Sequence, residues 1–177
     1  NDILELRGVI GELVRLAERN PGFVIRIHAG ENDSLCDNVA NSIRCVKEAL
    51  REGQKFPALR IGHGLYTCDL RSAKGARLLE ELRENAVTLE FQLSSNVRLN
   101  NLSSLERHPL RHYLAAGVHC VQGTDGGALY GTNSIDEELS LEKLLGLRFE
   151  ELCRMRRSED AILESSRRVF EEKSAQF

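Results

Sequence analysis

Four short apolar segments alternate along the chain with longer segments of helical periodicity. The apolar segments lie near residues 23–28, 59–63, 87–93 and 118–124. Each has the length of a buried strand. Between them, and before the first, apolar residues recur at helical spacing, as Ile3, Leu6 and Ile10 do. Strands that alternate with helices in this way predict parallel strands joined by helical crossovers.

Polar side chains with catalytic potential stand at the ends of all four predicted strands. They are His28 with Glu31, His63, the Ser95-Asn96 pair, and Asp125. From residue 28 to 63, 95 and 125 the intervals are 35, 32 and 30 residues, the length of one βα unit. The carboxyl ends of parallel strands share one face of a sheet, and this face carries the active site in (βα) barrels. We therefore expect these side chains to lie close together.

The number of strands bears on the domain organisation. A (βα)8 barrel takes about 250 residues, and this chain has 177 residues and four predicted strands. Residues 1–177 therefore predict a single α/β domain that makes up about half of a TIM-type (βα)8 barrel. A lone half-barrel would expose two strand edges, which promote aggregation. We expect either a homodimer or a fragment of a longer protein that holds the other half of the barrel.

The residue types at the strand ends suit metal-assisted hydrolysis. Imidazole is the commonest nitrogen ligand of zinc, which makes His28 a candidate ligand, and Asp125 offers an oxygen ligand. Glu31 is a candidate general acid or base, and His63 stands between two glycines that let a ligand approach closely. Taken alone, each residue has an ordinary explanation as a solvated loop or a turn. Their occurrence at successive strand ends favours a functional site.

Composition excludes several other classes of protein. Lys and Arg number 24 against 27 Asp and Glu, for a net charge of −3, whereas a nucleic-acid binder needs a basic excess or stripe. No apolar run reaches the roughly 18 residues that span a bilayer, so we expect no membrane association. The five cysteines are widely spaced and include no C-x-x-C pair. This pattern is typical of reduced thiols in the cytoplasm, with Cys36 or Cys68 as a remote alternative metal ligand.

Motifs at the strand ends resemble those of the C-terminal half of the adenosine deaminase family. They are His28-Ala29-Gly30-Glu31, Ile61-Gly62-His63-Gly64, Leu89-Glu90 followed by Ser95-Asn96, Thr124-Asp125, and the preceding His108-Pro109-Leu110. The resemblance implies a zinc-dependent (βα)8 barrel of purine metabolism that replaces the amino group of adenosine, or of a related purine nucleoside, with water. It also implies that this chain is the C-terminal half of the TIM-type barrel, with a missing N-terminal half.

The resemblance also implies a role for each matching residue. His28 and Asp125 would bind zinc, and Asp125 would orient the attacking hydroxide. Glu31 would protonate the purine ring, and His63 would act as a base or an electrostatic stabiliser. Asn96, with Ser95, would support the substrate pocket.

The chain lacks one motif of the family that bears on metal binding. The family's His-x-His pair, which supplies two zinc ligands, occurs nowhere in the sequence. The remaining histidines do not replace it, because His108 and His112 flank a predicted helix start and His119 lies at the beginning of its strand. A catalytic zinc site takes three protein ligands. We therefore expect weak zinc binding or none, and no activity, from this chain alone.

A second departure concerns the substrate. Gly126 and Gly127 occupy the positions at which the family has a purine-contacting aspartate and a proline. A polar group of the substrate that loses its partner costs affinity steeply, so the substrate stays open. The alternative to an enzyme is a catalytically inactive module of the same fold that binds a nucleoside or a protein partner.

Overall fold

A computed structural model describes residues 2–102 and 104–175 of the chain. Its single sheet consists of β1 (Ile25–Ala29), β2 (Leu59–His63), β3 (Thr88–Phe91) and β4 (His119–Gln122). The strands follow one another in the order β1-β2-β3-β4, and every neighbouring pair is parallel. The predicted α/β class and parallel sheet are therefore confirmed, with the sequential strand order of part of a (βα) barrel.

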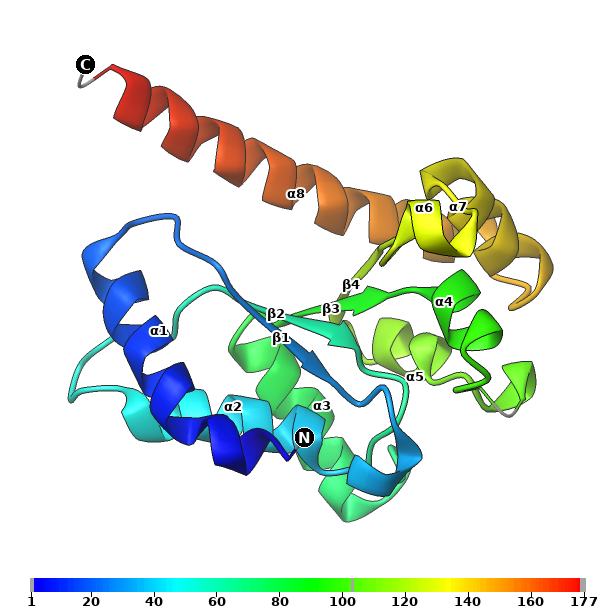
Figure 1. The fold of residues 1–177 in the computed structure, drawn as a ribbon, viewed down its shortest axis with the longest axis horizontal. Helices are drawn as coiled ribbons and strands as arrows, with labels where there is room; N and C mark the ends of the chain where they lie inside the picture. The colour runs from blue at the N-terminus through cyan, green and yellow to red at the C-terminus, as the bar shows by residue number, and fades with distance from the viewer. Residues whose placement is uncertain (1, 103, 176–177) are drawn as a thin grey trace.

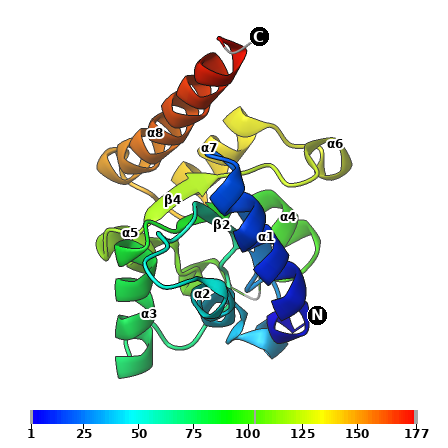
Figure 2. The ribbon, with the colours of Figure 1, turned by 90° about the vertical axis from the view of Figure 1, so that its left-hand side faces the viewer.

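Helices precede, connect and follow the strands. They are α1 (Arg7–Arg19), α2 (Asn38–Ala49), α3 (Ala73–Glu84), α4 (Leu93–Arg98), α5 (Leu110–Ala115), α6 (Gly127–Tyr130), α7 (Ser134–Lys143) and α8 (Phe149–Ser174), with 3-10 turns at Ile3–Leu6, Asp33–Leu35 and Leu105–Arg107. Figure 1 shows α2 and α3 on one side of the sheet and α8 on the other, and Figure 2, turned by 90°, shows the same separation. Both faces of the sheet are thus partly covered.

The end of β3 differs from the sequence prediction. The apolar run 87–93 predicts a strand to Leu93, but the strand ends at Phe91 and Leu93 begins α4. The amide of Asn96 donates to the carbonyl of Gln92 at 3.1 Å, which closes the first helical turn. Leu93 is fully buried in this helix, as it would be at the end of a buried strand. Its apolar character therefore does not distinguish a strand from a helix at this position.

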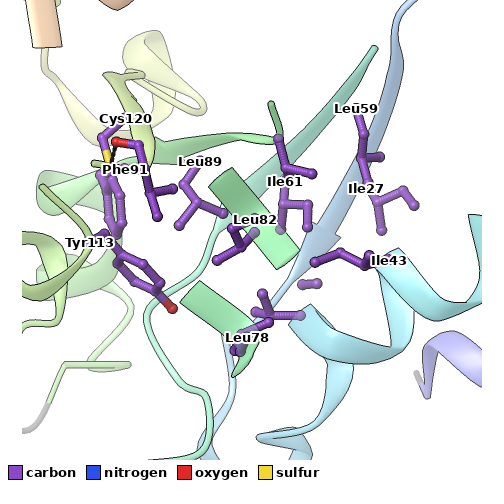
Figure 3. Close-up of a cluster of buried hydrophobic side chains, with 14 of the residues drawn as sticks. Ile27, Ile43, Leu59, Ile61, Leu78, Leu82, Leu89, Phe91, Tyr113 and Cys120 are labelled. Atoms are coloured by element: carbon purple, nitrogen blue, oxygen red, sulfur yellow. Dashed lines mark hydrogen bonds between the residues drawn. The ribbon is translucent and has the colours of Figure 1, made fainter. Parts of the chain in front are cut away.

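The core lies between the sheet and the helices α2, α3 and α5 (Figure 3). Along β1, Ile25, Ile27 and Ala29 are buried, whereas the alternating Arg26 and His28 are exposed. Ile61 and Leu89 continue this buried row on the next two strands. Burial of each large aliphatic side chain contributes about 1.5–3 kcal/mol. The alternation therefore directs the polar strand residues to the other face of the sheet.

Aromatic side chains anchor the far end of the core. The rings of Phe91 and Tyr113 lie 5.8 Å apart, and the Tyr113 hydroxyl donates to the carbonyl of Gly64 at 3.2 Å. Because Gly64 follows His63 directly, this bond connects α5 to the loop after β2. Core packing thus supports one of the segments that carry predicted site residues.

The structure also bears on the expectations about thiols and membranes. All five cysteines are free, and Cys45 and Cys120 are buried. Within residues 2–102 and 104–175, no helix is both long enough and apolar enough to cross a membrane.

Candidate active site

Three of the predicted site residues lie together at the carboxyl ends of β1 and β2. His28 is the fourth residue of β1, Glu31 follows in the next loop, and His63 ends β2. The imidazole centroids of His28 and His63 are 5.3 Å apart, with 57° between the ring planes. Oε1 of Glu31 lies 3.8 Å from Nε2 of His63. The ends of the four strands and the segments that follow them directly are called the rim below; these segments carry Glu31, Asn96 on α4, and Asp125.

A glycine makes room for the His28 ring. His28 and Gly62 are neighbours in the β1–β2 register. A Cβ atom at position 62 would lie only 2.4 Å from Cδ2 of His28, and no real side chain tolerates such a contact. Gly62 therefore lets the imidazole of His28 lie across β2 towards His63.

Two rim residues have backbones in the left-handed region. His63 has φ = 72° and Asp125 has φ = 53°. This conformation is unfavourable for residues with a Cβ atom, by about 1–2 kcal/mol, and such strain is found preferentially at functional sites. The positive φ turns each side chain away from the direction that a continued strand would give it.

His63 is almost fully buried and well supported. It is 2% exposed, and its backbone amide donates to Oε1 of Gln92 at 3.2 Å. Nδ2 of Asn96 lies 3.3 Å from Nδ1 of the His63 ring. With Nδ2 as the donor, the proton of the neutral imidazole is on Nε2, which faces Glu31.

Several groups act on the pKa of His63. Burial has the largest effect and lowers the pKa below its usual value, while the carboxylates of Glu31 and Asp125 act in the opposite direction. His28 and Arg26 lower the pKa further. The net result is a lowered pKa, so His63 is neutral at pH 7.

Glu31 is held by one hydrogen bond and is partly open to solvent. Oε1 accepts from Nδ2 of Asn101 at 3.3 Å, and the side chain is 38% exposed. Among the described residues, Oε2 has no hydrogen-bond donor, which leaves this oxygen free to face a bound molecule.

Asp125 lies on the same rim but does not complete a metal centre. It is exposed, and its effect on the pKa of His63 places it within electrostatic range. Over the part of the chain that the structure describes, no three or more His, Cys, Asp or Glu side chains are arranged to hold a metal ion. His28 and Asp125 thus provide at most two of the three protein ligands that a catalytic zinc ion takes. These residues alone do not fit such an ion.

Ion pairs with the buried Glu90 lie on the same face of the sheet as His28. Glu90 on β3 is 2% exposed, and it pairs with Arg26 of β1 and Arg60 of β2. Nε of Arg26 donates to Oε2 of Glu90 at 2.7 Å. The cluster connects three strands on the face that also carries His28.

The remaining histidines lie away from the rim residues. His119 is the first residue of β4, at the amino end of that strand, and its Nδ1 lies 3.5 Å from the Ser158 hydroxyl on α8. His112 is exposed on α5, where it accepts from Nε of Arg71 at 3.3 Å. His108, which precedes α5, is buried against the Phe91 ring at 5.5 Å.

Sequence reasoning missed two residues that support the site. Gln92 holds the backbone of His63, and Asn101 holds Glu31. A polar residue inside the apolar run 87–93 is a signal that could have indicated Gln92. The Asn100-Asn101 loop has no comparable signal, because 70 residues separate Asn101 from its partner Glu31.

A sequential parallel sheet with imidazoles and carboxylates at its carboxyl ends is the arrangement of (βα)-barrel hydrolases. Comparison with known sequences narrows this class. The sequence profile described as "Adenosine deaminase" matches residues 15–174. The chain therefore belongs to the adenosine deaminase family.

Curated relatives and solved structures agree with this assignment. The chain is 32% identical over 148 residues to the adenosine deaminase of Edwardsiella ictaluri, which covers 82% of this chain and 40% of the relative. It is 30% identical over 161 residues to that of Salmonella typhimurium, covering 89% and 44%. The chain thus spans about two fifths of the length of these relatives.

The solved structures share the fold at low sequence identity. Adenine deaminase from Arthrobacter aurescens superposes with a TM-score of 0.58 at 23% identity, over 93% of this chain and 49% of the other. The apo N6-methyl-AMP deaminase from Arabidopsis thaliana superposes with a TM-score of 0.59 at 19% identity, over 97% and 56%.

Proposed function

We propose that the chain provides the C-terminal part of the active site of a hydrolytic deaminase that acts on adenosine or a related purine nucleoside. The observation that supports this most is the approach of Glu31 Oε1 to within 3.8 Å of His63 Nε2, beside the His28 ring. Hydrolytic deamination needs a proton donor for the ring nitrogen and stabilisation of the charge that develops on the attacking oxygen. Glu31 and His63 can meet these two needs from one side of a substrate.

The hydrogen bonds of the site suggest how the two roles divide. Asn101 occupies Oε1 of Glu31, so Oε2 is the atom from which a proton would pass to the purine ring. His63 carries its proton on Nε2 when Asn96 donates to Nδ1. A neutral imidazole of this tautomer donates a hydrogen bond, which favours an electrostatic stabiliser over a base. Asp125 would accept from the attacking water and orient it.

Zinc dependence is a proposal that rests on the family resemblance. His28 and Asp125 are the candidate ligands, and by themselves they do not make up a three-ligand centre. A cytoplasmic location is likewise a proposal, supported by the reduced cysteines.

The substrate pocket is expected to differ from that of a strict adenosine deaminase at Gly126. A Cβ atom at position 126 would lie 3.3 Å from Cβ of Leu129 and 3.3 Å from Cε2 of Tyr130. The aromatic ring of Tyr130 thus lies beside the position of the missing carboxylate. The names of the relatives supply the substrates to compare: adenosine, adenine and N6-methyl-AMP.

The test is ammonia release from these three compounds, with and without added zinc. It uses this chain and, separately, the polypeptide encoded by the whole reading frame, each also analysed for metal content. We expect no turnover by the 177-residue chain and turnover by the longer product. Glu31→Gln should lower kcat by about 10²–10⁴-fold, because it removes the proton donor. Glu142→Gln, at an exposed position of α7, is the matched control.

A second function is favoured by two observations: His28 and Asp125 are only two candidate zinc ligands, and Gly126 lacks a side chain that could contact the substrate. In this reading the chain is a catalytically inactive module that binds a nucleoside or a protein partner. Nucleoside binding by the longer product with no ammonia release from any of the three compounds would support it. The same result would refute the deaminase proposal.

A further inference from the structure

Glu137 is a carboxylate that the mechanism above does not use, although it is buried close to the rim. It lies on α7 and is 1% exposed. Both of its oxygens lie 3.3 Å from the backbone nitrogen of Ser94, and the Thr132 hydroxyl donates to Oε1 at 3.1 Å. An ionised carboxylate is costly to bury unless hydrogen bonds replace its water. A buried glutamate in this position therefore needs a reason beyond packing.

The contact with Ser94 completes the start of α4. Ser94 is the second residue of this helix, and the amide at this position normally bonds to the side chain of the N-cap residue. The N-cap residue here is Gln92, whose side chain makes no such bond. Instead, Gln92 is directed to the backbone of His63. Glu137 supplies the missing acceptor from another helix.

Through α4, the same contact reaches the catalytic histidine. Asn96 lies two residues after Ser94, is 1% exposed, and places Nδ2 3.3 Å from Nδ1 of His63. On its other side, Glu137 binds Thr132, in the segment that follows Asp125. One carboxylate thus connects the loop after β4 with the helix that supports the ring of His63.

We propose that Glu137 is a positioning residue of the active site. It fixes α4 so that Asn96 holds the His63 ring in the tautomer and orientation that the reaction requires. The inference rests on the proposed function for its catalytic consequence, but its structural part can be tested without any activity.

The structural part is tested by hydrogen exchange of backbone amides in the 177-residue chain. In Glu137→Ala we expect the amide of Ser94 to exchange at least about tenfold faster, because it loses its acceptor. Glu142→Ala, on the exposed face of α7, should leave this rate unchanged. If the Ala variant fails to fold, Glu137→Leu, which fills the space but offers no acceptor, takes its place under the same criterion. Equal exchange of Ser94 in the position-137 variant and the control would overturn the proposal, whatever the protein's activity.

The catalytic part is tested by a double-mutant cycle in whichever preparation releases ammonia. Glu137→Ala and Asn96→Ala should each lower kcat by about tenfold or more, with a smaller change in KM. The double variant should be no slower than Asn96→Ala alone, because Glu137 acts through Asn96. Independent losses that multiply would show a general structural role and refute the inference, while the deaminase proposal would stand. Absence of ammonia release from every preparation would refute the deaminase proposal, and the exchange experiment would still decide the role of Glu137.

Discussion

At the scale of single residues, burial prepares the side chain of His63 for its proposed role. Its ring is enclosed, its pKa is lowered by that burial, and a positive φ turns it out of the strand direction. The polar partners Gln92 and Asn96 then define the orientation of a neutral ring. Such an arrangement favours hydrogen-bond donation at neutral pH over a charged imidazolium.

A second buried histidine, His108, should make the stability of the chain depend on pH. Burial lowers its pKa from 6.5 to about 4, so the unfolded chain takes up this proton first as the pH falls. The contribution of His108 to stability is therefore complete above pH 6.5 and is lost between pH 6.5 and about 4. At the lower end the loss approaches about 3 kcal/mol.

Urea unfolding of the wild type and of His108→Leu at several pH values checks this prediction. The difference in unfolding free energy between the two proteins should shift in favour of the variant as the pH falls through this window. His112→Leu, at an exposed position of α5, is the control and should follow the wild type. A His108→Leu variant with the same pH dependence as the wild type would contradict the assignment.

The sequence predicts the candidate site residues better than it predicts the residues that hold them in place. The approach of His28, Glu31 and His63 follows from their place at the ends of adjacent parallel strands. Asn101 could not be predicted as the partner of Glu31, because loop conformation decides that contact across 70 residues. The contacts of Glu137 could not be predicted either, since a glutamate in a charged helical segment normally indicates a solvated face.

At the scale of elements, the cluster of Arg26, Glu90 and Arg60 connects β1, β2 and β3. Glu90→Gln should destabilise the fold by about 2–3 kcal/mol. The variant loses the buried anion and leaves the two-thirds-buried side chain of Arg60 without its partner. Arg26→Gln should cost less, since Glu90 keeps Arg60 and the Arg26 side chain is 53% exposed.

Denaturation midpoints and slopes in urea measure both effects. Glu171→Gln removes the carboxylate of a pair with Arg167 in which both side chains are more than 60% exposed, and it should change the unfolding free energy by less than about 0.5 kcal/mol. A Glu90→Gln variant as stable as this control would show that the cluster does not hold the strands together.

The extent of elements is predictable where the apolar period is unambiguous. The four strands and the helices between them follow from alternation of short apolar runs with helical periodicity. The turn from β3 into α4 does not, because residues 92–93 can be buried either as a strand end or as the first turn of a helix. Two contacts stabilise the helical turn. The Asn96 amide donates to the Gln92 carbonyl, and the Glu137 carboxylate on α7 accepts from the Ser94 amide.

At the scale of the whole molecule, the two ends of the sheet differ in character. A cavity of about 930 Å³ lies at the amino ends of the strands, between residues such as Phe23 and Phe56 and the helix α8. None of the predicted site residues lines it. The candidate site residues lie at the opposite end, on the rim, so the strand direction identifies the candidate site where cavity size alone would not.

The free edge of β1 leads to a prediction about assembly. The amide of Ile25 donates to the carbonyl of Ala58, on the side of β2. The amides of the alternating residues Arg26 and His28 therefore point to the opposite side of β1, where the described residues include no further strand. Because such an edge pairs readily with another strand, we expect two copies to associate. Two chains of 19.9 kDa should sediment as a dimer near 40 kDa.

A proline at position 26 tests pairing through the outward amide, and an alanine at the same position controls for the loss of the Arg26 side chain. Arg26→Pro removes the outward amide without touching the bonds to β2, and it should sediment as a monomer near 20 kDa. Arg26→Ala loses the same ion pair with Glu90 but keeps the amide, so it should remain a dimer. A wild-type chain that sediments near 20 kDa with native circular dichroism would exclude pairing through this edge. Dimers of equal stability in both variants would assign the association to another surface.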